Sequence, residues 1–186
     1  MTFSIDQFRL DGKVAIVTGA GGRGNSIGRA YALGLAAAGA AVIVADINED
    51  GAKAVAAEIA STGGKALGVR TDITDQASVA AMAAAAEREF GGVDILVNNA
   101  ALMVEIVATP AIQHTTEQWN RAFAVNVTGA LNCSQAVVPL MAKRGGGKII
   151  NQVSGGAFPA STVYGITKIA LVGLTTTLAR ELGGQN

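Results

Sequence analysis

The sequence lacks several features that mark whole classes of protein. It holds one cysteine, Cys133, which cannot close an internal disulfide, so we expect a reducing, cytoplasmic location. Its 14 basic and 14 acidic side chains cancel, so there is no excess of positive charge to attract nucleic acid or an anionic membrane surface. We therefore expect no nucleic acid and no membrane among its partners.

Long apolar runs are missing as well. The N-terminus, MTFSIDQFRLDGK, has no charged stretch followed by an apolar core, so no secretory leader is predicted. The apolar stretches break well before the ~18 residues that a membrane span needs. No spacing of Cys, His and carboxylates indicates a metal site. The 186 residues are typical of one domain, so we expect a single domain over residues 1–186.

Aromatic residues make up only 4% of the chain while 50% of it is hydrophobic, so aliphatic side chains must build the core. Five short aliphatic runs alternate with longer stretches of helical pattern. The runs show little period-two alternation, as in parallel strands buried on both faces, and the alternation with helices predicts a doubly wound α/β sheet. The expected strands are 13–18, 41–46, 65–70, 93–98 and 147–154, and the expected helices are 26–39, 49–64, 75–92, 116–144 and 161–182.

Local signals set some of the helix boundaries. Asn48 and either Thr74 or Asp75 are predicted N-caps, and Thr115 with Gln118 can form a capping box. Pro139 is expected to kink the last turns of the fourth helix.

A glycine-rich stretch, TGAGGRGNSIG (18–28), connects the first strand to the first helix. Glycines let a backbone approach a pyrophosphate closely, and a helix N-terminus offers N–H donors and a partial positive charge. Such a stretch can also be an ordinary strand–helix turn. Its position in the first βαβ unit favours a nucleotide site.

The second strand ends in Asp46. An acid at this place can accept hydrogen bonds from both hydroxyls of an adenosine ribose and repels a 2′-phosphate. Neither Ile47 nor Asn48 supplies a cation, so NAD is favoured over NADP. Arg23, inside the loop, is the residue that could reverse this preference. The alternative role for Asp46 is to cap the helix that follows.

Seven short motifs occur in order along nearly the whole chain. They are TGAGG…IG, AD, TDIT, NNAA, VNVTGA, NQVS and YGITK. Together they resemble the short-chain dehydrogenase/reductases with a Tyr-x-x-x-Lys site. The resemblance implies a Rossmann-type sheet of strand order 3-2-1-4-5, lacking the sixth and seventh strands with which relatives continue. The chain ends at ARELGGQN, which would leave the fifth strand as a bare edge, so we expect it to be part of a longer protein.

The resemblance also implies roles for individual residues. The family's general acid/base is a tyrosine, its lysine holds the nicotinamide ribose, a serine orients the substrate oxygen, and an asparagine helps to hold a water in the proton relay. The matching catalytic residues are Tyr164, Lys168, Ser154 and Asn126. The implied cofactor-binding residues are Gly19, Gly21, Arg23, Ser26, Ile27, Gly28, Asp46, Ile47, Asp72, Ile73, Asn98, Ala100, Tyr164 and Lys168.

Tyr164 and Lys168 are four residues apart, so on a helix they share one face. A nearby ammonium lowers the pKa of a tyrosine, which near 10 is too high for a base at neutral pH. Each of these residues also has a structural alternative: a Tyr/Lys pair can be a helix surface, Asn126 can interrupt a helix, and Ser154 can be a turn residue.

The sequence departs from the family pattern at two places in the site. The loop before Ser26-Ile27-Gly28 is longer than usual, which resembles enoyl-acyl carrier protein reductases, but their tyrosine and lysine are spaced more widely than in YGITK. Ser154 lies only ten residues before Tyr164, which indicates a shortened loop.

The expected function is that of an NAD(H)-dependent oxidoreductase interconverting a secondary alcohol and a ketone. The stretch ALMVEIV (101–107), with Phe158 and Pro159, is expected to wall the pocket and favours an apolar or mixed small-molecule substrate. The alternatives are an NADP(H)-dependent 3-oxoacyl-thioester reductase and a non-catalytic dinucleotide-binding protein or fragment. Because the helices at 116–144 and 161–182 commonly pair between subunits in the family, we expect a homo-oligomer, favouring a tetramer.

Overall fold

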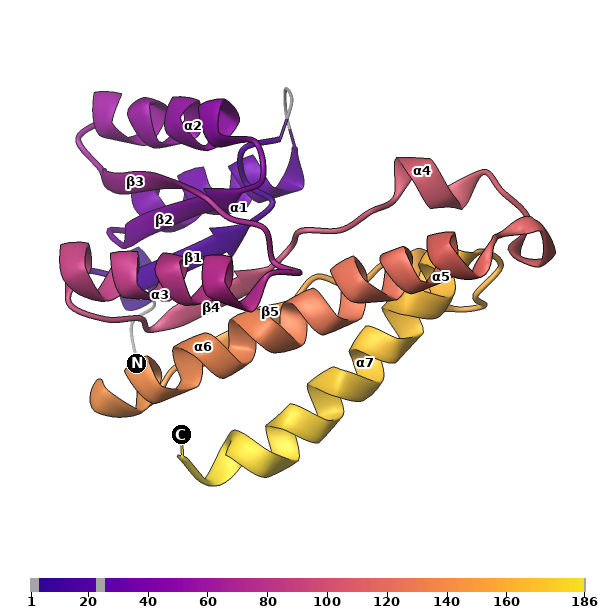
Figure 1. The fold of residues 1–186 in the computed structure, drawn as a ribbon. Coiled ribbons are helices and arrows are strands. Elements are labelled where there is room, and N and C mark those ends of the chain that lie inside the picture. Colours follow the sequence, from indigo (N-terminus) through magenta and orange to yellow (C-terminus); the bar gives the residue numbers. More distant parts are fainter. Residues whose placement is uncertain (1–3, 23–25, 186) are drawn as a thin grey trace.

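The computed structural model describes residues 4–22 and 26–185, and its centre is a parallel sheet of five strands (Figure 1). The strand order is β3-β2-β1-β4-β5, as predicted. The strands are β1 (Val14–Thr18), β2 (Ala41–Asp46), β3 (Lys65–Arg70), β4 (Ile95–Asn98) and β5 (Lys148–Asn151). The fifth strand is shorter than the predicted 147–154. Its backbone pairing ends with Gln152 N, which donates to Asn98 O at 3.0 Å, before Ser154 caps a 3-10 turn.

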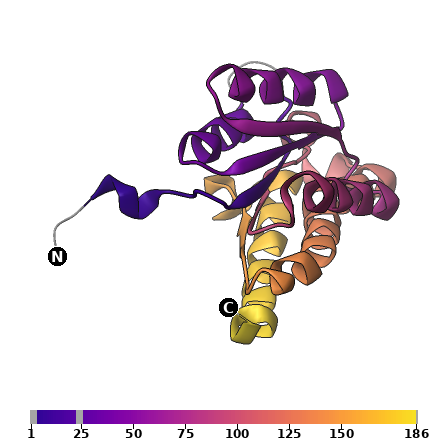
Figure 2. The same cartoon turned by 90° about the vertical axis from the view of Figure 1, so that its left-hand side faces the viewer.

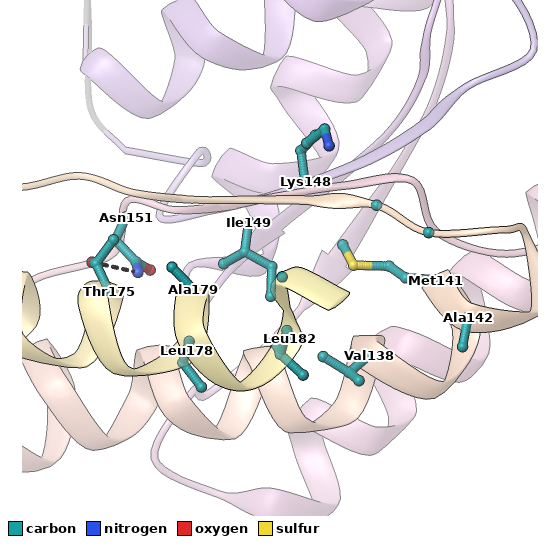
Figure 3. A pocket seen from close by; sticks show the side chains of 13 residues that line it. Val138, Met141, Ala142, Lys148, Ile149, Asn151, Thr175, Leu178, Ala179 and Leu182 are labelled. Atoms are coloured by element: carbon teal, nitrogen blue, oxygen red, sulfur yellow. Dashed lines mark hydrogen bonds between the residues drawn. The ribbon is translucent and has the colours of Figure 1, made fainter. Parts of the chain in front are cut away.

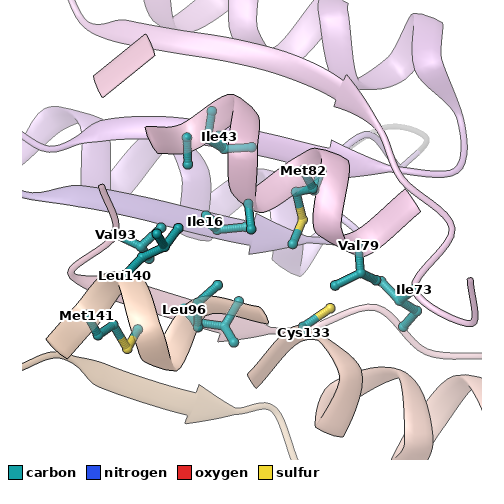
Figure 4. Close-up of a cluster of buried hydrophobic side chains, with 14 residues drawn as sticks. Ile16, Ile43, Ile73, Val79, Met82, Val93, Leu96, Cys133, Leu140 and Met141 are labelled. Atoms are coloured by element: carbon teal, nitrogen blue, oxygen red, sulfur yellow. The ribbon is translucent and has the colours of Figure 1, made fainter. Parts of the chain in front are cut away.

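Helices cover the sheet on both faces (Figures 1 and 2). On one face lie α1 (Ile27–Ala37) and α2 (Glu49–Ser61), and on the other lie α3 (Gln76–Phe90) and α6 (Gly129–Lys143). Neighbouring residues of one strand serve opposite faces: Ile16 packs toward α3 and α6 (Figure 4), whereas Val17 packs toward α1 and α2. Because both faces are covered, β1 is buried along its whole length, which explains why its sequence shows no alternation.

The predicted fourth helix is interrupted. It consists of α5 (Thr116–Phe123), a π-helical segment (Ala124–Thr128) and then α6. Its start is as predicted, because Thr115 and Gln118 form a capping box. Pro139 lies inside α6, which continues to Lys143. The sequence did not predict the π segment. Its residue Asn126 makes tertiary contacts that are described below.

The other helix boundaries follow their caps. Asn48 and Asp75 are the N-caps of α2 and α3, as predicted. The last helix, α7 (Val163–Leu182), begins two residues after Ser161, because Thr162 is its N-cap and accepts a hydrogen bond from Gly165 N. Short 3-10 turns occupy Ile5–Phe8, Ala111–Gln113, Gly155–Ala157 and Gly183–Gln185.

The stretch 101–107, expected to wall the substrate pocket, contains a short helix, α4 (Val104–Val107). It lies at the end of the molecule where α5 and the first turns of α7 meet (Figure 1). No helix of the described residues is long and apolar enough to pass through a membrane.

Candidate active site

The parallel strands bring the motifs to one edge of the sheet. The glycine-rich stretch follows β1, Asn99 and Ala100 follow β4, and Ser154 follows β5. β1 pairs with β2 on one side and with β4 on the other. The chain that leaves β1 therefore crosses toward β2, whereas the chain that leaves β4 crosses in the opposite direction, toward β5. Ligands of open α/β sheets bind in the crevice at such a switch point.

The loop after β1 is packed tightly against the end of β4. Gly19 has a positive φ of 67°, and a Cβ atom there would lie 2.7 Å from the Cα of Ala100. A Cβ atom on Gly28 would collide with the carbonyl of Gly19. Asn99 Nδ2 donates to the carbonyls of Thr18 and Gly19 at 3.0 and 3.1 Å. Asn99 was not singled out from the sequence, although it is the second residue of NNAA.

The serine at the end of the glycine-rich stretch caps the helix. Ser26 is the N-cap of α1, and its Oγ accepts a hydrogen bond from Arg29 N at 3.3 Å. The amides of Ile27 and Gly28, in the first turn, have no acceptor within the helix. They are therefore suited to an anion such as a pyrophosphate. Arg23, the other unusual residue of this loop, lies outside the described residues.

Asp46 holds the loop from the other side. Its Oδ2 accepts from Gly21 N and its Oδ1 from Asn48 N, both at 2.9 Å. The helix-capping role belongs to Asn48, whose side chain accepts from Gly51 N. The side chain of Ile47 is exposed. Arg70 lies opposite Asp46 in the backbone register of β2 and β3, so both residues stand at the same end of the sheet.

Asp72 and Ile73 follow β3. Hydrogen bonds from the side chain and then the backbone of Thr74 hold the pKa of Asp72 below its usual value, although burial opposes them. Ile73 is buried in the core against Gly129, and Asn132 Nδ2 donates to its carbonyl at 3.0 Å. The side chain of Ile73 therefore belongs to the packed core.

Asn98 joins the central strands to their neighbours. Its Nδ2 donates to Ala130 O and Ser134 Oγ on α6, each at 3.3 Å, and to Asn151 Oδ1 on β5 at 2.9 Å. Ala100 N donates to Thr18 Oγ1 at 3.2 Å, which brings the ends of β4 and β1 together.

Tyr164 and Lys168 lie on one face of α7. The Nζ atom of Lys168 is 5.5 Å from the centroid of the Tyr164 ring. Lys168 is 2% exposed, its Nζ donates to Gln152 O at 2.6 Å, and burial lowers its pKa from 10.5 to about 8. Tyr164 packs against an apolar cluster that includes Ile106 and Trp119.

The side chain of Asn126 is fully engaged. It accepts from Leu102 N at 2.7 Å and donates to Leu102 O at 2.9 Å and Thr167 Oγ1 at 3.0 Å. These bonds tie the π segment to the loop after β4 and to α7; π segments occur frequently at functional sites. Ser154 Oγ accepts from Gly156 N at 3.1 Å, so the serine begins the turn that leads toward Tyr164.

A cavity of about 300 Å³ lies elsewhere, between α6, α7 and the edge strand β5 (Figure 3). Its wall includes Val138, Met141, Ile149 and Leu178, and it contains no residue of the Tyr164 site. The cavity is therefore separate from the candidate active site.

The chain belongs to the short chain dehydrogenase family, whose pattern matches residues 13–186. It is 40% identical to the D-threitol dehydrogenase of Mycolicibacterium smegmatis, over 98% of this chain and 69% of that protein. It is also 40% identical to the 7alpha-hydroxysteroid dehydrogenase of Escherichia coli K12, over 99% of this chain and 71% of that protein. The expected enzyme class, an oxidoreductase acting on CH–OH groups, is confirmed.

A solved structure shares the fold over the whole chain. It is a 7alpha-hydroxysteroid dehydrogenase in complex with NADH and 7-oxo glycochenodeoxycholic acid, with a TM-score of 0.90 and 39% identity. The match covers 100% of this chain and 71% of that one. The predicted Rossmann-type sheet is therefore confirmed.

Proposed function

We propose that the protein is an NAD(H)-dependent oxidoreductase that interconverts a secondary alcohol and a ketone, with Tyr164 as general acid/base. The observation that carries the proposal is the buried ammonium of Lys168 at 5.5 Å from the Tyr164 ring. The family and the NADH in the solved relative support it.

The pair accounts for the proton transfer. In alcohol oxidation the Tyr164 phenolate takes the proton of the substrate hydroxyl, and in ketone reduction the Tyr164 hydroxyl returns it. With a pKa of about 8, Lys168 is still mainly protonated at pH 7, and its burial strengthens the field at the phenolate.

The residues at the carboxyl edge of the sheet are suited to a nicotinamide dinucleotide. The loop at Gly19, Gly21 and Gly28 leaves no space for side chains and ends at helix amides suited to a pyrophosphate. We assign the adenosine ribose to Asp46 and Ile47. When bound, the nicotinamide supplies the hydride acceptor and donor. Lys168 would also hold the nicotinamide ribose, and Ser154 would orient the substrate oxygen. The remaining proposed contacts are Arg23, Ser26, Ile27, Asp72, Ile73, Asn98 and Ala100, and Asn126 would help to hold a water of the proton relay.

An apolar part of the substrate is proposed from the segments next to Tyr164. Ile106 of α4 packs in the same cluster as Tyr164, while its neighbours Val104 and Val107 are 75% and 42% exposed. Phe158, between Ser154 and Tyr164, is 67% exposed. Exposed apolar side chains on segments that adjoin a catalytic group are suited to binding a ligand.

The test is a panel of secondary alcohols and ketones, from polyols to steroids, with NADH absorbance as the readout. Tyr164→Phe should lower kcat by about 10²- to 10⁴-fold and leave the Kd for NADH, from fluorescence titration, within about twofold. Ser61→Ala, which removes a hydroxyl at the end of α2, should leave both unchanged. Turnover that survives Tyr164→Phe would show that the assigned acid/base is wrong. NADH binding without turnover anywhere in the panel would favour a non-catalytic dinucleotide-binding protein.

A further inference from the structure

The other tyrosine of the chain, Tyr31, is hydrogen-bonded to the residue that holds Lys168. Tyr31 lies on α1, and its hydroxyl donates to Gln152 Oε1. The backbone carbonyl of the same Gln152 accepts the hydrogen bond from Lys168 Nζ at 2.6 Å. Gln152 is thus hydrogen-bonded to α1 through its side chain and to Lys168 through its backbone carbonyl.

Gln152 is fixed at each of its polar groups. Its backbone N donates to Asn98 O at 3.0 Å, and its Nε2 donates to Val153 O at 2.8 Å. Added to the bonds from Tyr31 and Lys168, these leave no polar atom of Gln152 without a partner. A satisfied network of this kind restricts a group to one position more strongly than a single bond does.

The position of Tyr31 on α1 connects this network to the glycine-rich loop. Ile27 and Tyr31 are four residues apart, so they lie on the same side of α1, one turn from each other. Ile27 and Gly28 form the helix start to which the pyrophosphate was assigned. A single hydrogen-bonded path therefore leads from the helix of the proposed phosphate site, through Tyr31 and Gln152, to Lys168.

We infer that Tyr31 and Gln152 are positioning residues for Lys168. The Tyr31 hydroxyl holds Gln152, and the Gln152 carbonyl holds the ammonium at its distance from the Tyr164 ring. The inference rests on the proposed function, because it assumes that the place of the ammonium sets how strongly the Tyr164 phenolate is stabilised.

The same strand offers a matched control. Asn151, the neighbour of Gln152, donates through Nδ2 to Thr175 Oγ1 on α7 at 2.9 Å. Thr175→Val deletes this hydrogen bond at the end of β5, together with the bond that Thr175 Oγ1 donates to Leu171 O at 2.7 Å, and neither partner is the residue that holds Lys168. A bond that serves stability alone should give the same result at both positions.

The first measurement does not depend on activity. The titration of Lys168 is followed by NMR in the cofactor-free protein with ¹³C-labelled lysine, and Lys168→Met assigns the signal. The wild-type midpoint is expected at about 8. Tyr31→Phe should lower it by about 0.3 to 1 pH unit, because a loosened carbonyl stabilises the charged form less. Thr175→Val should leave it unchanged. Equal midpoints in wild type and Tyr31→Phe would overturn the inference.

The second measurement uses turnover. Tyr31→Phe should reduce kcat for alcohol oxidation about three- to tenfold, the size of one hydrogen bond, and change KM less than twofold. The acidic limb of the pH profile should move to higher pH, because the Tyr164 phenolate is stabilised less. Gln152→Met removes the acceptor of the Tyr31 bond, and the double variant should be no slower than the slower single variant. Additive losses, or an equal loss in Thr175→Val, would contradict the inference.

The outcomes separate the two proposals. If wild type turns over nothing in the panel, the proposed function fails, and the NMR midpoints still decide the positioning role. If Tyr164→Phe is inactive while Tyr31→Phe matches wild type in midpoint and pH profile, the positioning role alone is wrong.

Discussion

The ammonium of Lys168 lies 5.5 Å from the centroid of the Tyr164 ring, one turn away on α7, and is almost completely removed from water. A buried cation held by a backbone carbonyl is costly, and burial accordingly lowers the pKa of Lys168 to about 8. Such groups persist where they serve a purpose other than stability, because active sites commonly sacrifice stability for function.

Lys168→Met should therefore raise the free energy of unfolding while it removes activity. At pH 7 we expect a gain of about 1–3 kcal/mol, measured by urea unfolding, because the penalty for burying the charged amine disappears. The folded-state pKa of Lys168, about 8, lies below the unfolded value of 10.5. In wild type the penalty is full below pH 8 and is lost as the pH rises to 10.5, so the gain from the substitution should shrink over that window.

The comparison needs a neutral-to-basic pH series of both proteins. The wild-type curve alone is ambiguous, because burial raises the pKa of Cys133 to about 12, and that shift lowers stability as the pH rises above 9. The difference between wild type and Lys168→Met cancels this contribution. A destabilised Lys168→Met protein at pH 7 would mean that the hydrogen bond to Gln152 outweighs the cost of burial.

The motifs predicted the sheet because strand order in this fold follows from short local patterns. Buried aliphatic runs and their glycine-rich ends are local features, and four of the five strands lie within two residues of their predicted bounds. The π segment was missed because it depends on contacts of Asn126 with Leu102 and Thr167, which are distant in sequence. An unbroken helical pattern from 116 to 144 carries no sign of those partners.

In the site, too, local spacing was predictable and contacts between distant residues were not. The pair Tyr164 and Lys168 was predictable, since their spacing alone places them on one helix face. The contacts of Gln152 were not, because they join α1, β4 and α7 through side-chain and backbone groups that no spacing reveals. Ser26 was singled out as a cofactor-binding residue, and the structure shows that its side chain caps α1.

Cofactor preference should depend on the charge of Asp46. Asp46→Asn keeps an oxygen that can accept from Gly21 N and removes the negative charge. We expect the ratio of kcat/KM for NADP to that for NAD to rise by about tenfold or more, because the repulsion of a 2′-phosphate is lost. Steady-state kinetics with both cofactors measures it.

Arg70 provides the companion variant. It lies opposite Asp46 in the backbone register of β2 and β3, and a guanidinium at this end of the sheet can attract a 2′-phosphate once the charge of the acid is removed. Asp46→Asn with Arg70→Ala should therefore gain less activity with NADP than Asp46→Asn alone. An unchanged cofactor ratio in Asp46→Asn would show that the acid does not select the cofactor.

An exposed isoleucine on α7 offers a test of the expected homo-oligomer. The buried residues of this helix, Val163 to Leu171, all lie in its first half, and Ile169 is 41% exposed. Ile169→Asp should shift the wild-type assembly, a tetramer by our expectation, toward smaller species in light scattering. Ala57→Asp adds the same charge at an exposed position of α2 and should not change the mass. A monomeric wild-type protein would contradict the expectation.

Asp94 and Arg144 join three elements at the other end of the sheet. Asp94 is 5% exposed, and its Oδ2 accepts from Val14 N at 2.8 Å and from Arg144 Nε at 3.0 Å. Arg144 in turn donates to Gly12 O at 2.8 Å. Burial alone would raise the pKa of Asp94, but the hydrogen bonds from Arg144 and Val14, with the charges of Arg144 and Lys13, outweigh it and keep the pKa below 3.8.

Asp94→Asn should consequently lower the free energy of unfolding at pH 7 by about 2–4 kcal/mol, because it leaves Arg144 without its anion. The folded-state pKa lies below the unfolded one, so the wild-type advantage is full well above pH 3.8 and is lost as the pH falls through the folded-state pKa. Urea unfolding of both proteins between pH 7 and pH 3 should show the difference closing at the acid end. Asp11→Asn breaks the exposed pair with Arg9 and should cause no measurable change. Equal losses in the two variants would mean that burial of Asp94 adds nothing to its ion pair.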